Sequence, residues 1–175
     1  MTASAHALRR FLLAFVALAS AAAAAEPATP EAAVSALWRA LSHGPGEGAD
    51  KAALEALFDP SAQVYGVAEK DGRLVLVRRS AAEFIARQAQ PSPKPFLERE
   101  VHRETRRYGA FAEVFATVES RSADPDGAAD FTGINSVHLY QQEGRWRIVG
   151  LYYHLERADQ PIPARWRGAA EPARP

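Results

Sequence analysis

Strand-forming side chains are most concentrated in residues 133–156. β-Branched and aromatic residues stand on both sides of a turn at residues 142–145, which contains Gly144. Such a pattern around a glycine-containing turn is a strong signal for a β-hairpin. We therefore predict that residues 133–156 form two long antiparallel strands, which serve as the floor of the domain.

Four further strands are predicted upstream, in two pairs. The first pair turns at Asp71-Gly72, a dipeptide that favours the tight turns of hairpins, and the second pair bends at Gly109. Residues 121–130 are rich in Asp, Pro and Gly and are predicted to form a loop. The four strands are Ala62–Val67, Arg73–Val77, Phe96–Tyr108 and Phe111–Ser120.

Helical segments are predicted where apolar residues recur at spacings of three and four. Thr29, Asp50 and Ser80 can each cap a helix, and Ser80 forms the capping-box pattern with Glu83. The apolar stripes contain Val34, Leu37, Trp38 and Leu41 in the first helix, Leu54, Leu57 and Phe58 in the second, and Phe84 and Ile85 in the third.

The order of these elements is helix, helix, strand, strand, helix and then four long strands. Helices followed by a run of antiparallel strands indicate the α+β class. We expect a cone-shaped, strongly curved, mixed antiparallel sheet with about three N-terminal helices packed over its concave face. A cone of this kind leaves a cavity at its wide end.

The first 25 residues are predicted to be a signal peptide. Arg9-Arg10 precedes an apolar run from Phe11 to Ala25, and Ala23-Ala24-Ala25 offers a small-residue cleavage site. The run is shorter than the roughly 20 residues that cross a bilayer. We therefore expect a periplasmic or secreted bacterial protein with no stable membrane span after cleavage. The predicted divisions are a signal peptide at 1–25, one domain at 26–157 and a Pro-rich, flexible tail at 158–175, in which Ile162 and Trp166 could dock.

Charge and composition narrow the possible partners. The chain has 21 basic and 21 acidic side chains, a balance that gives no general attraction to nucleic acid. It has no Cys, so it has neither disulfides nor thiolate metal sites. The histidines lack the spacing of metal ligands. No metal and no cofactor are predicted.

Four short motifs accompany this order of elements. They are Phe-x-Glu-x-Glu at 96–100, Gly-x-x-Ala-x-Val at 109–114, Gly-x-Asn-Ser at 133–136 and Gly-Arg-Trp-x-Ile at 144–148. With them, residues 30–156 resemble the nuclear transport factor 2 (NTF2)-like superfamily, in particular its small bacterial members of the SnoaL-like and DUF4440 type. The resemblance implies the cone-shaped fold.

The superfamily includes isomerases, dehydratases, hydrolases, cyclases and non-catalytic binding domains, so the resemblance does not choose a reaction. The pattern of ketosteroid isomerase, a carboxylate base opposite a Tyr and a protonated acid, finds no matching positions in this sequence.

Alternation along the strands predicts which side chains face the cavity. On the last strand we assign Trp146, Ile148, Gly150, Tyr152 and His154 to it. A Glu that faces an apolar cavity would have a raised pKa and could act as a general acid or base. Alternatively, the glutamates of residues 96–108 pair with neighbouring arginines. The candidate ligand-binding residues are Tyr65, Glu98, Glu100, His102, Asn135, Tyr152 and His154.

Three functions follow as hypotheses. The first is the binding of a small, largely apolar molecule in the cavity without catalysis. The second is a small lyase, isomerase or hydrolase that uses a cavity Glu or His as general acid/base. The third is a homodimeric interaction module that pairs through the outer face of the sheet, with Arg147, Val149, Leu151 and Tyr153 as candidates.

Overall fold

The computed structural model describes residues 27–124 and 126–168, and the predicted signal peptide lies outside them. Six strands form one sheet in the order β2-β1-β6-β5-β4-β3. β1 and β6 pair in parallel and the other neighbours are antiparallel, so the sheet is mixed, as predicted. The strands are β1 Phe58–Lys70, β2 Arg73–Ser80, β3 Leu97–Tyr108, β4 Phe111–Arg121, β5 Phe131–Gln142 and β6 Arg145–Leu155.

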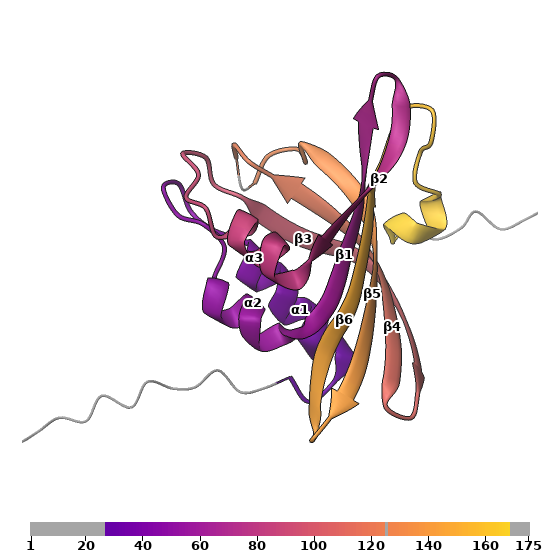
Figure 1. Ribbon diagram of the computed structural model, residues 1–175. Coiled ribbons are helices and arrows are strands. Elements are labelled where there is room, and N and C mark those ends of the chain that lie inside the picture. The colour runs from indigo at the N-terminus through magenta and orange to yellow at the C-terminus, as the bar shows by residue number, and fades with distance from the viewer. Residues whose placement is uncertain (1–26, 125, 169–175) are drawn as a thin grey trace, which may run out of the picture.

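Three α-helices lie against one face of the curved sheet (Figure 1). They are α1 Pro30–Leu41, α2 Lys51–Leu57 and α3 Ala81–Gln88. The predicted caps are confirmed: Thr29 and Asp50 accept hydrogen bonds from the first turns of α1 and α2, and Ser80 and Glu83 form a capping box. In the described part of the chain, none of the helices is long and apolar enough to cross a membrane.

All three hairpin turns follow the prediction, including the one at Gly109 between β3 and β4. Asp71-Gly72 and Glu143-Gly144 both have positive φ angles at their two residues. This is the geometry of the turns whose twist matches that of paired strands, and glycine adopts it without strain. β1 begins earlier than predicted, at Phe58, whose ring contacts Phe84 of α3 with centroids 5.8 Å apart. The pairing with β6 is irregular between Phe58 and Gln63, a stretch that includes Pro60.

A β-bulge in β3 changes which residues face the helices. Glu100 pairs with Val118 and His102 pairs with Thr117, so Val101 is an extra residue in the strand. An extra residue inverts the alternation beyond it. Glu98 and Glu100 lie on the concave side, whereas His102 lies on the convex side. The prediction that Glu98, Glu100 and His102 share one face is therefore wrong for His102.

A second bulge, in β6, has the same effect. His138 pairs with Gly150 and Leu139 pairs with Ile148, which leaves Val149 as the extra residue. Trp146 and Ile148 are buried on the concave side, as predicted. Beyond Val149 the faces are exchanged. Leu151, Tyr153 and Leu155 face the helices, while Gly150, Tyr152 and His154 face outward, in contrast to the prediction.

The segment after β6 packs on the sheet. It contains a short 3-10 helix, η1 Ala164–Arg167, on the side of the sheet opposite to the α-helices (Figure 1). The Trp166 ring contacts Phe115 of β4 with centroids 4.9 Å apart, and Ile162 is buried. Ile162 and Trp166 thus dock on the rest of the domain, and the flexibility of residues 158–175 stays a prediction.

Candidate functional site

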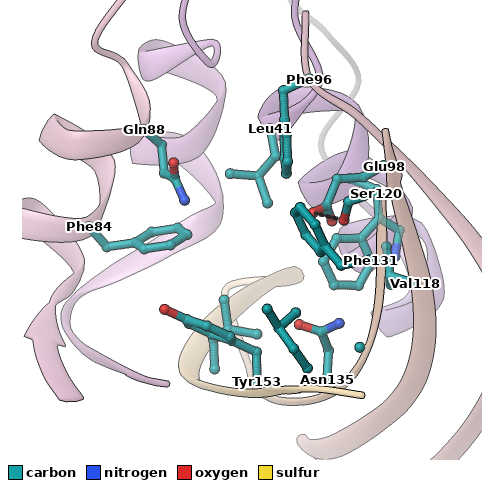
Figure 2. Close-up of a pocket in the computed structure, with 14 residues that line it drawn as sticks. Leu41, Phe84, Gln88, Phe96, Glu98, Val118, Ser120, Phe131, Asn135 and Tyr153 are labelled. Carbon is teal, nitrogen blue, oxygen red and sulfur yellow. Dashed lines mark hydrogen bonds between the residues drawn. The ribbon is translucent and has the colours of Figure 1, made fainter. Parts of the chain in front are cut away.

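A cavity of about 310 Å³ lies between the concave face of the sheet and helices α1 and α3. Figure 2 shows the side chains that surround it. Most of its wall is apolar. The apolar and aromatic lining residues are Trp38, Leu41, Phe84, Phe96, Val118, Phe131, Leu151, Tyr153 and Leu155. The polar lining residues are Gln88, Glu98, Ser120 and Asn135. A small, mainly apolar cavity with a few polar groups is typical of a small-molecule site.

Glu98 is held in the wall by two elements. Its backbone N–H donates to Ser42 Oγ at 3.0 Å, and Ser42 in turn donates to the last turn of α1 through the Trp38 carbonyl oxygen at 2.8 Å. Its side chain lies beside β4, where Ser120 Oγ donates to Glu98 Oε1 at 3.2 Å. These contacts fix the carboxyl group at the edge of the cavity, as Figure 2 shows.

Burial raises the pKa of Glu98 to about 7, and the hydrogen bond from Ser120 lowers it only in part. The reason is desolvation, because the ionised carboxylate loses water without gaining a cationic partner. A carboxyl group with such a pKa is present in both protonation states near neutral pH. It can therefore donate a proton to, or accept one from, a molecule in the cavity.

Glu100 has a different environment, although it lies only two residues away. It accepts hydrogen bonds from Trp38 Nε1 and Arg103 Nη2, both at 2.7 Å. Arg103 also donates to Ser35 Oγ at 2.8 Å. Glu100 is thus part of a network that ties α1 to β3, and it does not line the cavity. Of the two alternatives predicted for the glutamates of residues 96–108, the raised pKa in an apolar cavity applies to Glu98, and pairing with an arginine applies to Glu100.

Three neutral polar side chains complete the lining. Gln88, Asn135 and the Tyr153 hydroxyl make no hydrogen bond within the part of the chain that the structure describes, so each can bind a ligand atom. The Tyr153 ring lies against Gly66 of β1, where a Cβ atom would come within 2.3 Å of it. Because Gly66 has no side chain, it leaves the space that the Tyr153 ring occupies over the cavity floor.

The structure brings together only part of the predicted site. Glu98 and Asn135 line the cavity, and Glu100 lies next to it. The other candidates lie on the convex face. Tyr65 stacks on Tyr152 with centroids 4.6 Å apart, His102 Nε2 is 3.4 Å from Glu104, and His154 Nδ1 is 2.8 Å from the Leu155 carbonyl oxygen.

Sequence reasoning missed several lining residues. Ser120 continues the inward series Ala112, Val114, Ala116 and Val118 on β4, so alternation could have identified it. Gln88 follows Phe84 by one helical turn, which is also a readable signal. Unbroken alternation places Tyr153 on the outer face, and the signal that could have corrected this is Gly150 beside Val149, because a glycine inside a strand often accompanies a bulge. Over the residues that the structure describes, no group of His, Cys, Asp and Glu side chains is arranged to hold a metal ion.

No protein-family model and no curated protein matches this chain. Solved structures with the same arrangement were found. An NTF2-like protein of unknown function from Shewanella baltica is 18% identical with a TM-score of 0.50, over 72% of this chain and 90% of that one. A protein from Parabacteroides distasonis named as a candidate ketosteroid isomerase is 12% identical with a TM-score of 0.50, over 74% and 89% of the two chains.

An NTF2-like protein of unknown function from Silicibacter pomeroyi is 24% identical with a TM-score of 0.46, over 72% of this chain and 92% of that one. The two structures with TM-scores of 0.50 are similar to this chain in fold alone, and the finer SnoaL-like or DUF4440 assignment stays a prediction. The element order, the mixed curved sheet and the similar structures together show that the protein has the NTF2-like fold.

Proposed function

We propose that the protein binds a small, largely apolar molecule in the cavity between α1, α3 and the sheet. The observation that carries this proposal is an apolar cavity of about 310 Å³ whose unpaired polar groups point inward. Polar groups that line an apolar cavity without a protein partner remain available to a ligand, and a few such groups orient the ligand in a typical small-molecule site. The apolar wall would bind most of the ligand, and Glu98, Asn135 or Tyr153 would orient its polar atom.

The proposal can be tested at Phe131, which lines the cavity and is 38% exposed. Replacing Phe131 by Ala removes part of the wall, and the affinity for 1-octanol is expected to fall roughly tenfold because apolar contact is lost. Isothermal titration calorimetry would measure the change. Phe111→Ala, at an exposed position on β4, is the matched control and should leave the affinity unchanged. Equal effects of the two substitutions would contradict the proposal.

General acid/base catalysis is a second candidate function, and the raised pKa of Glu98 favours it. Glu98 could remove a proton next to the carbonyl group of a bound ketone. The expected result is that the protein accelerates deuterium incorporation into 2-octanone in D₂O, with a rate that rises with pH through about 7 as Glu98 ionises. NMR spectroscopy would measure that rate.

Glu98→Gln should lower this rate by roughly 10²–10⁴-fold, the usual contribution of a positioned base. Glu104→Gln, on the convex face of the same strand, should have no effect. If the Glu98→Gln protein and the unaltered protein exchange at the same rate, Glu98 is not a base for this reaction.

Export and homodimer formation remain predictions. The basis for export is the sequence of residues 1–25 alone. The basis for a homodimer is the outer face of the sheet, where the exposed Tyr152 stacks on the partly buried Tyr65 beside His138. Of the residues first suggested for that interface, Leu151 and Tyr153 line the cavity instead.

A further inference from the structure

A second hollow adjoins the cavity. It has a volume of about 500 Å³ and is formed by the end of α3, the loop of residues 90–96, His43 and Ser122. Gln88 and Phe96 line both the cavity and this hollow. In Figure 2 both side chains extend toward the cavity, Gln88 from α3 and Phe96 from the segment before β3. The cavity and the hollow are therefore adjacent at Gln88 and Phe96, and a ligand that passes between these two side chains would occupy both.

The hollow carries cationic groups and no acidic lining residue. Arg87 and Lys94 contribute to its wall. Within the described residues, the Arg87 side chain forms neither a hydrogen bond nor an ion pair. Lys94 interacts electrostatically with Asp130, but that carboxylate already accepts hydrogen bonds from Ser122 N and Oγ. The hollow thus offers an unpaired guanidinium group and an ammonium group to an anion.

The position of Arg87 has a simple structural explanation that does not extend to Lys94. A cation in the last turn of a helix interacts favourably with the helix dipole, and Arg87 occupies that turn of α3. Lys94 lies in a loop, so no helix accounts for it. Two cations on different elements face the same hollow, and one anion could bind both.

The backbone around the hollow is fixed before any ligand binds. His43 and Phe96 exchange two backbone hydrogen bonds of 2.7 and 2.9 Å. Gly46 donates to the Ser92 carbonyl oxygen at 2.7 Å, and Ser92 donates to the Glu47 carbonyl oxygen at 2.9 Å. These bonds tie the loop that carries Lys94 to the segment after α1. A fixed loop reduces the entropy that binding would otherwise cost.

We infer that the ligand is an amphiphile with a carboxylate head group, whose apolar part fills the cavity and whose carboxylate lies in the hollow between Arg87 and Lys94. The guanidinium group of Arg87 matches a carboxylate through paired hydrogen bonds. Gln88 and Phe96 mark the junction between the two parts of the ligand. This inference rests on the proposed function and adds to it the chemical class of the ligand.

The test compares three probes that share one alkyl chain: octanoate, 1-octanol and octyltrimethylammonium. Calorimetry at low salt should show that octanoate binds roughly tenfold more tightly than 1-octanol, as one charge-assisted hydrogen bond would give. Octyltrimethylammonium should bind more weakly than either. In the double variant Arg87→Gln/Lys94→Gln the preference for octanoate should disappear, while 1-octanol binds as before.

Arg39→Gln/Lys70→Gln is the matched control, because it makes the same change in net charge at exposed positions away from the hollow. It should keep the preference. If octanoate binds no more tightly than 1-octanol, or if the Arg87/Lys94 variant keeps the preference, the inference is overturned and the proposed function stands. If the preference is lost in Glu98→Gln instead, the head group lies at Glu98 and the inference is also wrong. If none of the probes binds, both fail.

Discussion

Replacing Glu98 by Gln is expected to stabilise the protein by about 3 kcal/mol above pH 8 and to have little effect at pH 4. The pKa of Glu98 is raised from 4.5 to about 7 in the folded chain by burial. Between these two values the folded state binds the proton more tightly than the unfolded state. The free energy of unfolding therefore falls as the pH rises through this window, and the full penalty is present above about 7. Gln is neutral and similar in shape, so it carries no such penalty.

Urea denaturation of both proteins between pH 4 and pH 9 would measure this difference. Other carboxyl groups, among them Glu119 and Asp130, have lowered pKa values because of their hydrogen bonds, so both proteins lose stability in acid. The difference between the two curves isolates Glu98. Glu104→Gln, at an exposed position on the same strand, removes one carboxyl group outside the cavity and is the matched control. A difference for Glu98→Gln that does not change with pH would show that the Glu98 carboxyl group is not desolvated.

A bound ligand should either offset or increase the free-energy cost of ionising the buried Glu98. The direction depends on which ligand group contacts the carboxyl group. A ligand hydroxyl or amide that donates to the carboxylate would favour its ionised form, whereas a ligand carbonyl oxygen would favour the protonated acid. The pH dependence of affinity thus reports the chemistry of the ligand atom at Glu98. It does so independently of the head group that we place at Arg87 and Lys94.

The sequence was sufficient to predict the order of elements, both tight turns and the helix caps, because each depends on a few local residues. The assignment of side chains to faces depends on an unbroken alternation. Two extra residues, Val101 and Val149, break it. Val101 has no Gly or Pro beside it, and the faces of β3 are mixed, so no contrast reveals the shift there. Val149 is followed by Gly150, and a glycine inside a strand is a general sign of a bulge, but both faces of β6 are apolar, so the pattern does not show that the faces are exchanged.

Whether a residue that we predicted to face the cavity does so depends on its position relative to the two bulges. Glu98 precedes the bulge in β3, and Asn135 lies on β5, where the alternation is intact; both line the cavity. His102, Tyr152 and His154 follow a bulge, and all three lie on the other face. Tyr65 lies on the convex face for a different reason. The inward positions of β1 are occupied by Val64 and Gly66, and Gly66 is small so that Tyr153 can pack against it. That contact joins strands β1 and β6 and has no local signal.

Replacing Trp146 by Ala is expected to lower the free energy of unfolding by roughly 3–5 kcal/mol. Trp146 is 1% exposed and lies before the bulge in β6, packed with the core that joins the sheet to the helices. Its removal would leave a cavity that the surrounding strands cannot close. Arg107 lies 4.9 Å from the ring centroid and would lose this contact as well. Urea denaturation monitored by circular dichroism would measure the loss.

Trp166→Ala provides the matched control, because it removes the same side chain from the outer face. Trp166 is only partly buried there, so its loss should cost less, roughly 1–2 kcal/mol. The indole Nε1 of Trp146 is buried without a hydrogen-bond partner among the described residues. Trp146→Phe should therefore cost less than Trp146→Ala, because it keeps a ring in the core and removes an unsatisfied donor. If Trp146→Ala costs no more than Trp166→Ala, then Trp146 does not occupy the core and the concave face of β6 is assigned incorrectly.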